Sequence, residues 1–170
     1  MSAVEGTTEA GGSGKSIHDS ALSADDATRA TLPHLPYADA VHAALAEVVM
    51  VPDLLETGVR QEHPRSKREL FLRLEWLPGH DDLVPAAAQA DGLTVEWSHL
   101  AGWSVRCGDA LAVLDVDELA DPATVAEAAM HAALCGLDCT CEKPPAGRWD
   151  QALSLDIALV HFDERETRTH

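Results

Sequence analysis

The segment from residue 69 to residue 76 constrains the fold of this chain more than any other feature. Every second residue in it is large and apolar, and the intervening set is mostly charged. The first set is Leu70, Leu72, Leu74 and Trp76, and the second is Glu69, Phe71, Arg73 and Glu75. A period of two predicts a β-strand with one face toward a core and the other toward water. The chain must therefore build a sheet with one buried face.

Other segments carry strand patterns bounded by turn signals. We predict further strands over residues 54–61, 93–98, 103–107 and 110–116, with a polar hairpin loop at 62–67. Gly108-Asp109 is typical of a two-residue hairpin turn, because glycine accepts the positive φ that such turns need. Trp97 and Trp103 are expected to pair across the hairpin between their strands. Such short connections indicate antiparallel pairing.

Helical spacing marks four more segments. We predict one helix that starts near Pro36 or Asp39 and is closed by Pro52, and others over 83–90, 122–135 and 148–162. The first should pack through Val41, Ala44, Leu45, Val48 and Val49. The third has the clearest limits, because Asp121 suits an N-cap, Pro122 the first helical position and Gly136 the stop. The apolar stripe of the last is Trp149, Leu153, Ile157 and Val160 or His161.

This element order predicts an α+β fold, with an antiparallel sheet of about five strands and helices packed on one face, rather than a doubly wound α/β fold. Residues 1–31 read as a disordered acidic tail rich in Gly, Ser and Ala, because they offer too little apolar surface to bury. We predict a single domain over 32–163 and a frayed C-terminus over 164–170. Alanine-rich helices and a sheet face that could expose aromatics favour self-association, for example as a homodimer.

The charge balance is strongly acidic, with 29 acidic and 12 basic residues and a net charge of −17. Repulsion of this sign opposes direct contact with nucleic acid or an anionic membrane and favours a basic protein partner. No apolar run approaches the ~20 residues of a membrane span, and no secretory signal is recognisable, so we expect a cytoplasmic protein. Its four cysteines are then expected to be reduced thiols or metal ligands rather than disulfides.

One cluster has metal-ligand character: His131-x3-Cys135-x3-Cys139-x-Cys141. Residues four apart on a helix point the same way, so His131 and Cys135 would share a face, with the other two cysteines in the loop beyond. Thiolates and imidazole suit zinc, although the spacing matches no standard zinc finger. The alternative is that Cys135 is a small buried hydrophobic residue and that Cys139 and Cys141 are incidental loop thiols.

A second cluster is basic and straddles the predicted 62–67 loop. It consists of Arg60, Arg65, Lys67, Arg68 and Arg73. These residues could dock a phosphate, a carboxylate or an acidic partner. The alternative is a solvated hairpin tip whose charges discourage edge-to-edge aggregation. We assign no catalytic residues, because neither the His80 nor the His161 neighbourhood couples a nucleophile to a base in a known motif.

The stretch from Tyr37 to Leu134 resembles an uncharacterised actinobacterial family of small acidic proteins, known as a domain of unknown function. The similar segments are residues 37–41 (Tyr-Ala-Asp-Ala-Val), residues 93–97 (Leu-Thr-Val-Glu-Trp) and residues 102–105 (Gly-Trp-Ser-Val). The element order is also similar to that of secretion-chaperone-like α+β domains, which are acidic and often dimeric. Neither resemblance implies a catalytic or binding residue.

Three functions fit these features. The first is a non-catalytic binding or regulatory module of adaptor, chaperone or immunity type that presents an acidic surface to a protein partner. The second is a DNA mimic that inhibits a nucleic-acid-binding protein. The third is a small zinc-binding protein or metal-dependent enzyme that uses the cluster at 131–141. No cofactor other than zinc is expected.

Overall fold

The computed structural model describes residues 28, 31–64, 66–141 and 146–168. Five antiparallel strands follow one another in the sheet in chain order: β1 (Leu54–Arg60), β2 (Glu69–Trp76), β3 (Leu93–Ser98), β4 (Gly102–Cys107) and β5 (Ala110–Val113). The main helices are α2 (Leu35–Glu47), α3 (Ala86–Asp91), α4 (Pro122–Cys135) and α5 (Ala152–Arg168). The predicted α+β fold with a five-stranded antiparallel sheet is confirmed.

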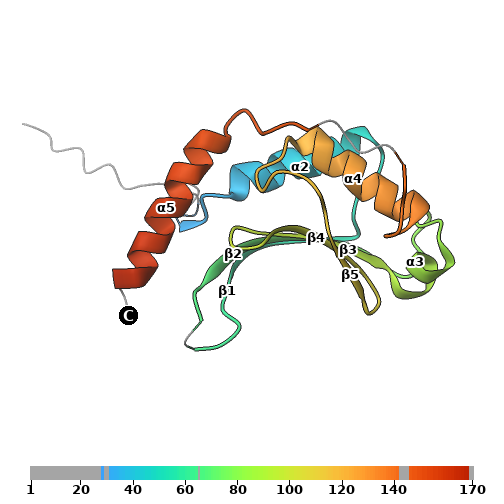
Figure 1. The fold of residues 1–170 in the computed structure, drawn as a ribbon, viewed down its shortest axis with the longest axis horizontal. Helices are drawn as coiled ribbons and strands as arrows, with labels where there is room; N and C mark the ends of the chain where they lie inside the picture. The colour runs from blue at the N-terminus through green and yellow to red at the C-terminus, as the bar shows by residue number, and fades with distance from the viewer. Residues whose placement is uncertain (1–27, 29–30, 65, 142–145, 169–170) are drawn as a thin grey trace, which may run out of the picture.

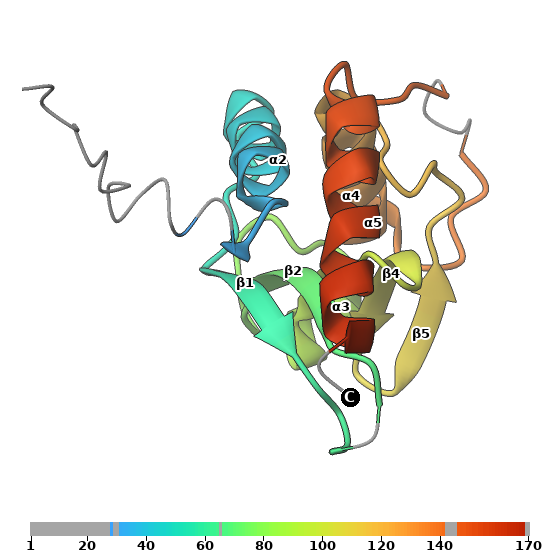
Figure 2. The ribbon, with the colours of Figure 1, turned by 90° about the vertical axis from the view of Figure 1, so that its left-hand side faces the viewer.

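Helices α2 and α4 lie above one face of the sheet, and the short helix α3 lies beside one end of it (Figures 1 and 2). Helices α2 and α4 run side by side and contact each other over that face. Helix α5 stands at one end of this layer, where Asp163 meets His99 of the loop after β3 and Glu166 meets Arg68 before β2. Among the described residues, no helix combines the length and the apolar character that a membrane span requires.

The core lies between the sheet and the α2–α4 pair. Its sheet face is formed by the alternate residues of β2 that the sequence pattern predicted, and by Trp97 and Trp103, which pair across β3 and β4 as expected. Cross-strand aromatic pairs of this kind stabilise a sheet by roughly 0.2–1 kcal/mol. The tryptophans at 76, 97 and 103 are at most 1% exposed. The expectation that the sheet exposes aromatics is therefore wrong, because these rings fill a core whose helices supply mostly alanine.

The outer face of the sheet carries charged side chains instead. There the ring of Phe71 is 7% exposed, because the guanidinium of Arg60 covers it with Cζ 5.1 Å from the ring centroid. Arg60 also pairs with Glu69 and, at 2.6 Å from Nη2 to Oε1, with Glu96. Hydrogen bonds to Glu96 and Glu69 raise the pKa of Arg60 further above neutrality. Three neighbouring strands, β1 to β3, are thus joined through one arginine.

Two polar side chains at the start of α2 are buried between this helix and the sheet. The hydroxyl of Tyr37 donates to the carbonyl of Ala120 at 2.7 Å and accepts from Nε1 of Trp103 at 3.3 Å. Nε2 of His34 lies 3.0 Å from the carbonyl oxygen of Phe71, while its Nδ1 is buried without a hydrogen-bond partner. Burial lowers the pKa of His34 to about 4, so this ring is neutral in the folded protein at pH 7.

Several predicted boundaries need correction. Helix α2 ends at Glu47 rather than near Pro52, because Val49 takes a φ of 57°, and Val49 is 79% exposed rather than packed. Strand β5 ends at Val113 rather than 116. Helix α3 starts after Pro85, and Gly92 ends it as expected. The predicted tail lies outside the described residues except for Thr28 and Thr31.

Helix α5 differs most from its prediction. It starts later, at Ala152, and continues to Arg168, through residues expected to fray. Three residues of its predicted inward stripe point outward, with Leu153 70%, Ile157 53% and Val160 57% exposed. Trp149, just before the helix, does pack against the core, with its ring centroid 5.0 Å from that of Tyr37. The buried face is instead formed by Ala152, Leu155 and Phe162. Apolar residues lie on two sides of this helix. The side with Leu155 and Phe162 packs against the rest of the protein, and the side with Leu153 faces solvent.

Candidate metal centre

The C-terminal end of α4 provides the first two side chains of a metal-ligand cluster. Pro122 occupies the first turn of the helix, and the alanine-rich sequence after it favours continued helix. Val125 and Ala129 are fully buried, which fixes how the helix is turned on the sheet. Because His131 and Cys135 are one helical turn apart, their side chains project from the same side near its end.

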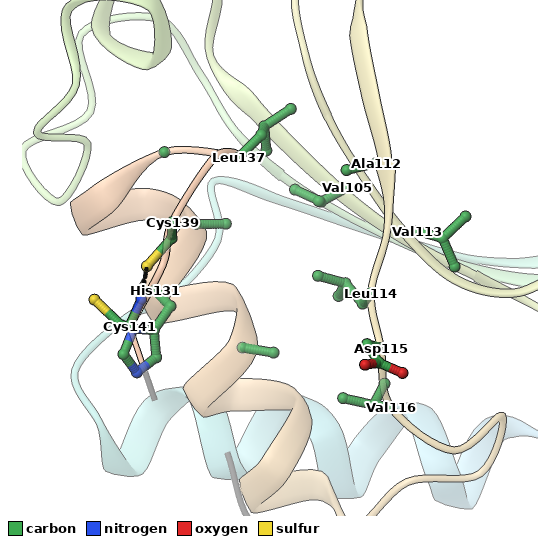
Figure 3. A pocket seen from close by; sticks show the side chains of 13 residues that line it. Val105, Ala112, Val113, Leu114, Asp115, Val116, His131, Leu137, Cys139 and Cys141 are labelled. Carbon is green, nitrogen blue, oxygen red and sulfur yellow. Dashed lines mark hydrogen bonds between the residues drawn. The ribbon is translucent and has the colours of Figure 1, made fainter. Parts of the chain in front are cut away.

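A reversal at Gly136 brings in the other two side chains. Gly136 has φ 87° and ψ 175°, a conformation essentially restricted to glycine, and its N–H donates to the carbonyl of Ala132. The chain then turns back along α4. As a result Sγ of Cys139 lies 3.9 Å from Nδ1 of His131 (Figure 3). Sγ of Cys141 lies 3.8 Å from Sγ of Cys135.

These four ligand atoms have nearly the spacing of a tetrahedral zinc site. All of them lie within 4.8 Å of one another. With Zn–S bonds of about 2.3 Å and a Zn–N bond of about 2.0 Å, the edges of the tetrahedron measure about 3.8 Å between sulfurs and about 3.5 Å between sulfur and nitrogen. The closest observed pairs, at 3.8 and 3.9 Å, come near these lengths. Shifts of about 1 Å in side-chain position would complete the site.

Hydrogen bonds within the cluster already separate the acidities of its thiols. Hydrogen bonds from the side chain and the backbone N–H of Cys141 lower the pKa of Cys139 to about 7. The same interaction with Cys139 raises the pKa of Cys141 to about 11. The N–H of Cys141 lies 3.4 Å from Sγ of Cys139. One thiolate, the form that binds metal, is therefore stabilised near neutral pH.

The cluster lies at the molecular surface beside an apolar wall. Cys135 and Cys141 are exposed, whereas His131 and Cys139 are half-buried. A groove of about 160 Å³ separates His131 and Cys139 from side chains of β4 and the segment after β5, among them Val105, Leu114 and Val116 (Figure 3). An ion could thus enter from solvent on one side while the apolar wall limits water on the other. The fourth cysteine, Cys107, is outside the cluster, and burial raises its pKa.

The donor set defines what the arrangement can do. Three soft sulfur atoms and one imidazole favour zinc over hard cations such as Mg²⁺ and Ca²⁺. Four protein ligands fill a tetrahedron, which leaves no position for the water molecule that a catalytic zinc ion activates. The chemistry available to the cluster is therefore tight metal binding and thiol reactivity rather than hydrolysis.

The residues of the predicted basic cluster do not form one free patch among the described residues. Arg60 pairs with Glu69 and Glu96, as described above, and Arg73 pairs with Glu75 at 3.0 Å. Arg68 reaches across to Glu166 of α5 at 3.1 Å. Lys67 is exposed, and Arg65 lies outside the described residues. Most of this positive charge is used in contacts within the chain.

Sequence reasoning missed the pairing of a buried histidine side chain with a partly exposed carboxylate. Nε2 of His99 lies 3.2 Å from Oδ1 of Asp163, and the side chain of His99 is 2% exposed. No local signal joins these residues, because one is in a hairpin loop and the other lies 64 positions later on a helix. The histidines noted in the sequence are less enclosed: His80 lies near Asp53 and Asp82, and His161 near Glu164 on the exposed side of α5.

The chain matches no family model, no curated protein and no solved structure. The resemblance of residues 37–134 to an actinobacterial family of unknown function thus stays a prediction.

Proposed function

We propose that this protein is a small zinc-binding protein that holds one Zn²⁺ between His131, Cys135, Cys139 and Cys141. The observation that supports it is geometric: four donors of the type zinc prefers lie within 4.8 Å of one another at one helix end. The 3.8 Å between Sγ of Cys135 and Sγ of Cys141 equals the sulfur–sulfur spacing of a tetrahedral thiolate site.

The ion would have a structural role in this site. His131 and Cys135 belong to α4, whereas Cys139 and Cys141 belong to the segment that folds back from Gly136. Bound zinc would clamp that segment against the helix. Because such a site forms only in the folded chain, the free energy of zinc binding adds to the stability of the fold. With no open coordination position, the site favours a structural or regulatory protein over a metal-dependent enzyme.

The test is metal analysis of the reduced full chain purified without chelator and without a metal affinity column. We expect one zinc per chain, and after replacement by Co²⁺ the visible absorption of a tetrahedral thiolate complex. Cys139→Ser and His131→Ala should lose most of the bound metal. Cys107→Ser is the matched control, because it removes a cysteine outside the cluster and should keep full occupancy.

Chelation gives the second readout. We expect EDTA to lower the melting temperature of the wild type and of Cys107→Ser, and to leave that of Cys139→Ser unchanged. Substoichiometric zinc together with the same melting curve in EDTA would contradict the proposal.

Protein binding remains a second candidate, supported by the net charge of −17. A basic partner would be attracted over a range set by ionic strength. The predicted basic cluster is a weaker docking surface than the acidic one. Its residues Arg60, Arg68 and Arg73 form ion pairs within the chain. Co-purification from native extract at two salt concentrations tests this candidate. A protein that stays alone at both concentrations would remove its support.

A further inference from the structure

Two of the four proposed zinc ligands differ from the others in access. Cys135 and Cys141 are exposed, and their sulfur atoms are 3.8 Å apart. Cys139 is half-buried, with Sγ lying between Nδ1 of His131 and the backbone N–H of Cys141. A small oxidant from solvent therefore reaches the sulfur atoms of Cys135 and Cys141 before it reaches the rest of the cluster.

We propose that Cys135 and Cys141 are an oxidation site, and that joining them in a disulfide by a hydroperoxide expels the zinc ion. This inference rests on the proposed zinc site and adds its regulation. Once the sulfurs of Cys135 and Cys141 are joined in a disulfide, only His131 and Cys139 remain as ligands. Two donors cannot hold zinc against water and cellular chelators as four can.

The reaction balances in two steps. The thiolate of one cysteine attacks an oxygen of the hydroperoxide, the O–O bond breaks, and the leaving alkoxide takes a proton to become an alcohol or water. The resulting sulfenic acid is attacked by the second thiolate, which forms the S–S bond and releases hydroxide, protonated to water. Two electrons pass from the two sulfurs to the peroxide, and a dithiol reductant returns them.

Exposure and the contacts of Cys139 favour one connectivity. A disulfide needs sulfurs about 2.0 Å apart. From 3.8 Å, each sulfur of the exposed pair must move by about 1 Å, which side-chain rotation at the end of α4 and in the returning segment can supply. A bridge from Cys139 to either partner would instead break its contacts with His131 and with the N–H of Cys141.

The sequence allows a direct readout. Protease cleavage before Asp121, Asp138 and Asp150 gives peptides 121–137 and 138–149, which separate Cys135 from Cys139 and Cys141. The experiment treats the reduced, zinc-loaded full chain carrying Cys107→Ser with hydrogen peroxide and follows a zinc indicator. We expect one zinc released for each linked peptide pair, and recovery of zinc binding after reduction by dithiothreitol.

Variants in the same background separate the cysteines. Cys139→Ser should keep the linked peptides, even where its zinc occupancy falls. Cys141→Ser should form the link at least about tenfold more slowly. A link that forms equally fast in Cys141→Ser, or peroxide treatment that leaves zinc fully bound, would overturn the oxidation site while the zinc site stands. Failure of the reduced wild type to bind zinc would instead remove the proposed function.

Discussion

Asp163 accepts a hydrogen bond from a histidine whose tautomer the fold determines. The backbone N–H of Leu70 donates to Nδ1 of His99 at 3.0 Å, so this nitrogen carries the lone pair and Nε2 carries the proton. Nε2 donates that proton to Oδ1 of Asp163, and the rings of His99 and Phe162 pack edge to face. The hairpin between β3 and β4 is thereby attached to α5.

Removing the acceptor should loosen this attachment. We expect Asp163→Ala to lower the free energy of unfolding by about 1–2 kcal/mol, because the buried N–H of His99 loses its partner. Asp163→Asn keeps an oxygen in place and should cost less. Asp156→Ala is the control on the same helix. Its carboxylate is as exposed as that of Asp163, but its partner Arg148 is also exposed, so this pair contributes little. Urea unfolding checks these values, and equal losses in all three variants would contradict them.

His34 should make stability depend on pH. Burial lowers its pKa from 6.5 to about 4. The unfolded chain therefore binds a proton more readily than the folded chain between these values, and unfolding becomes easier as the pH falls from about 6.5 to 4. Above pH 6.5, the full contribution of His34 to the free energy of unfolding is present. The pKa shift corresponds to a loss of about 3 kcal/mol of unfolding free energy once the pH is below both pKa values.

The measurement is urea unfolding at a series of pH values with two variants. In His34→Gln the fall in stability between pH 6.5 and 4 should be smaller than in the wild type. His42→Gln, which replaces an exposed histidine of α2, should keep the wild-type profile. Identical pH profiles for the wild type and His34→Gln would exclude His34 as the cause.

The two leucines at the start of α5 should respond very differently to truncation. Leu155 is 3% exposed and Leu153 is 70% exposed. We expect Leu155→Ala to cost about 2–5 kcal/mol of unfolding free energy, because it leaves a cavity in the core. Leu153→Ala should change stability by less than about 0.5 kcal/mol. If Leu153→Ala cost more than Leu155→Ala, the orientation of the helix would be wrong.

Gly136 should matter to zinc binding as well as to folding. A Cβ at φ 87° and ψ 175° costs about 1–3 kcal/mol, so Gly136→Ala should weaken the reversal that returns Cys139 to His131. We expect the zinc dissociation constant to rise at least about fivefold. Gly79→Ala is the matched control, because Gly79 has φ 83° but lies in a turn away from the cluster. Competition with a chromophoric chelator measures both constants.

The sheet could be predicted because its signal is local. The alternation in β2 and the short turns on either side of β4 specify antiparallel neighbours without knowledge of the rest of the chain. Helix α5 could not be oriented in this way. Its sequence offers an outward stripe through Leu153 and an inward face through Leu155, and the choice depends on contacts with a loop more than 50 positions earlier, at His99. Similarly, no pattern near His34 indicates that it is buried.

The candidate ligands could be named from spacing, since a turn of helix places His131 beside Cys135. Their convergence could not, because it depends on the backbone angles at Gly136 and on the path of the segment after it. The basic residues, unlike the candidate ligands, do not come together in the structure. Arg68 and Arg73 find different acidic partners on α5 and β2. Although these arginines are close in sequence, their side chains do not form one surface.

The order of the strands has a consequence for how the chain reaches its native state. Each strand pairs with its immediate successor, so the sheet needs no crossover. The connections are short, except the one from Trp76 to Leu93, which contains α3. Such local pairings carry a small entropic cost and favour rapid zippering from one hairpin to the next. The contact between α2 and α4 joins segments on either side of the whole sheet in sequence, so we expect it to be among the last to form.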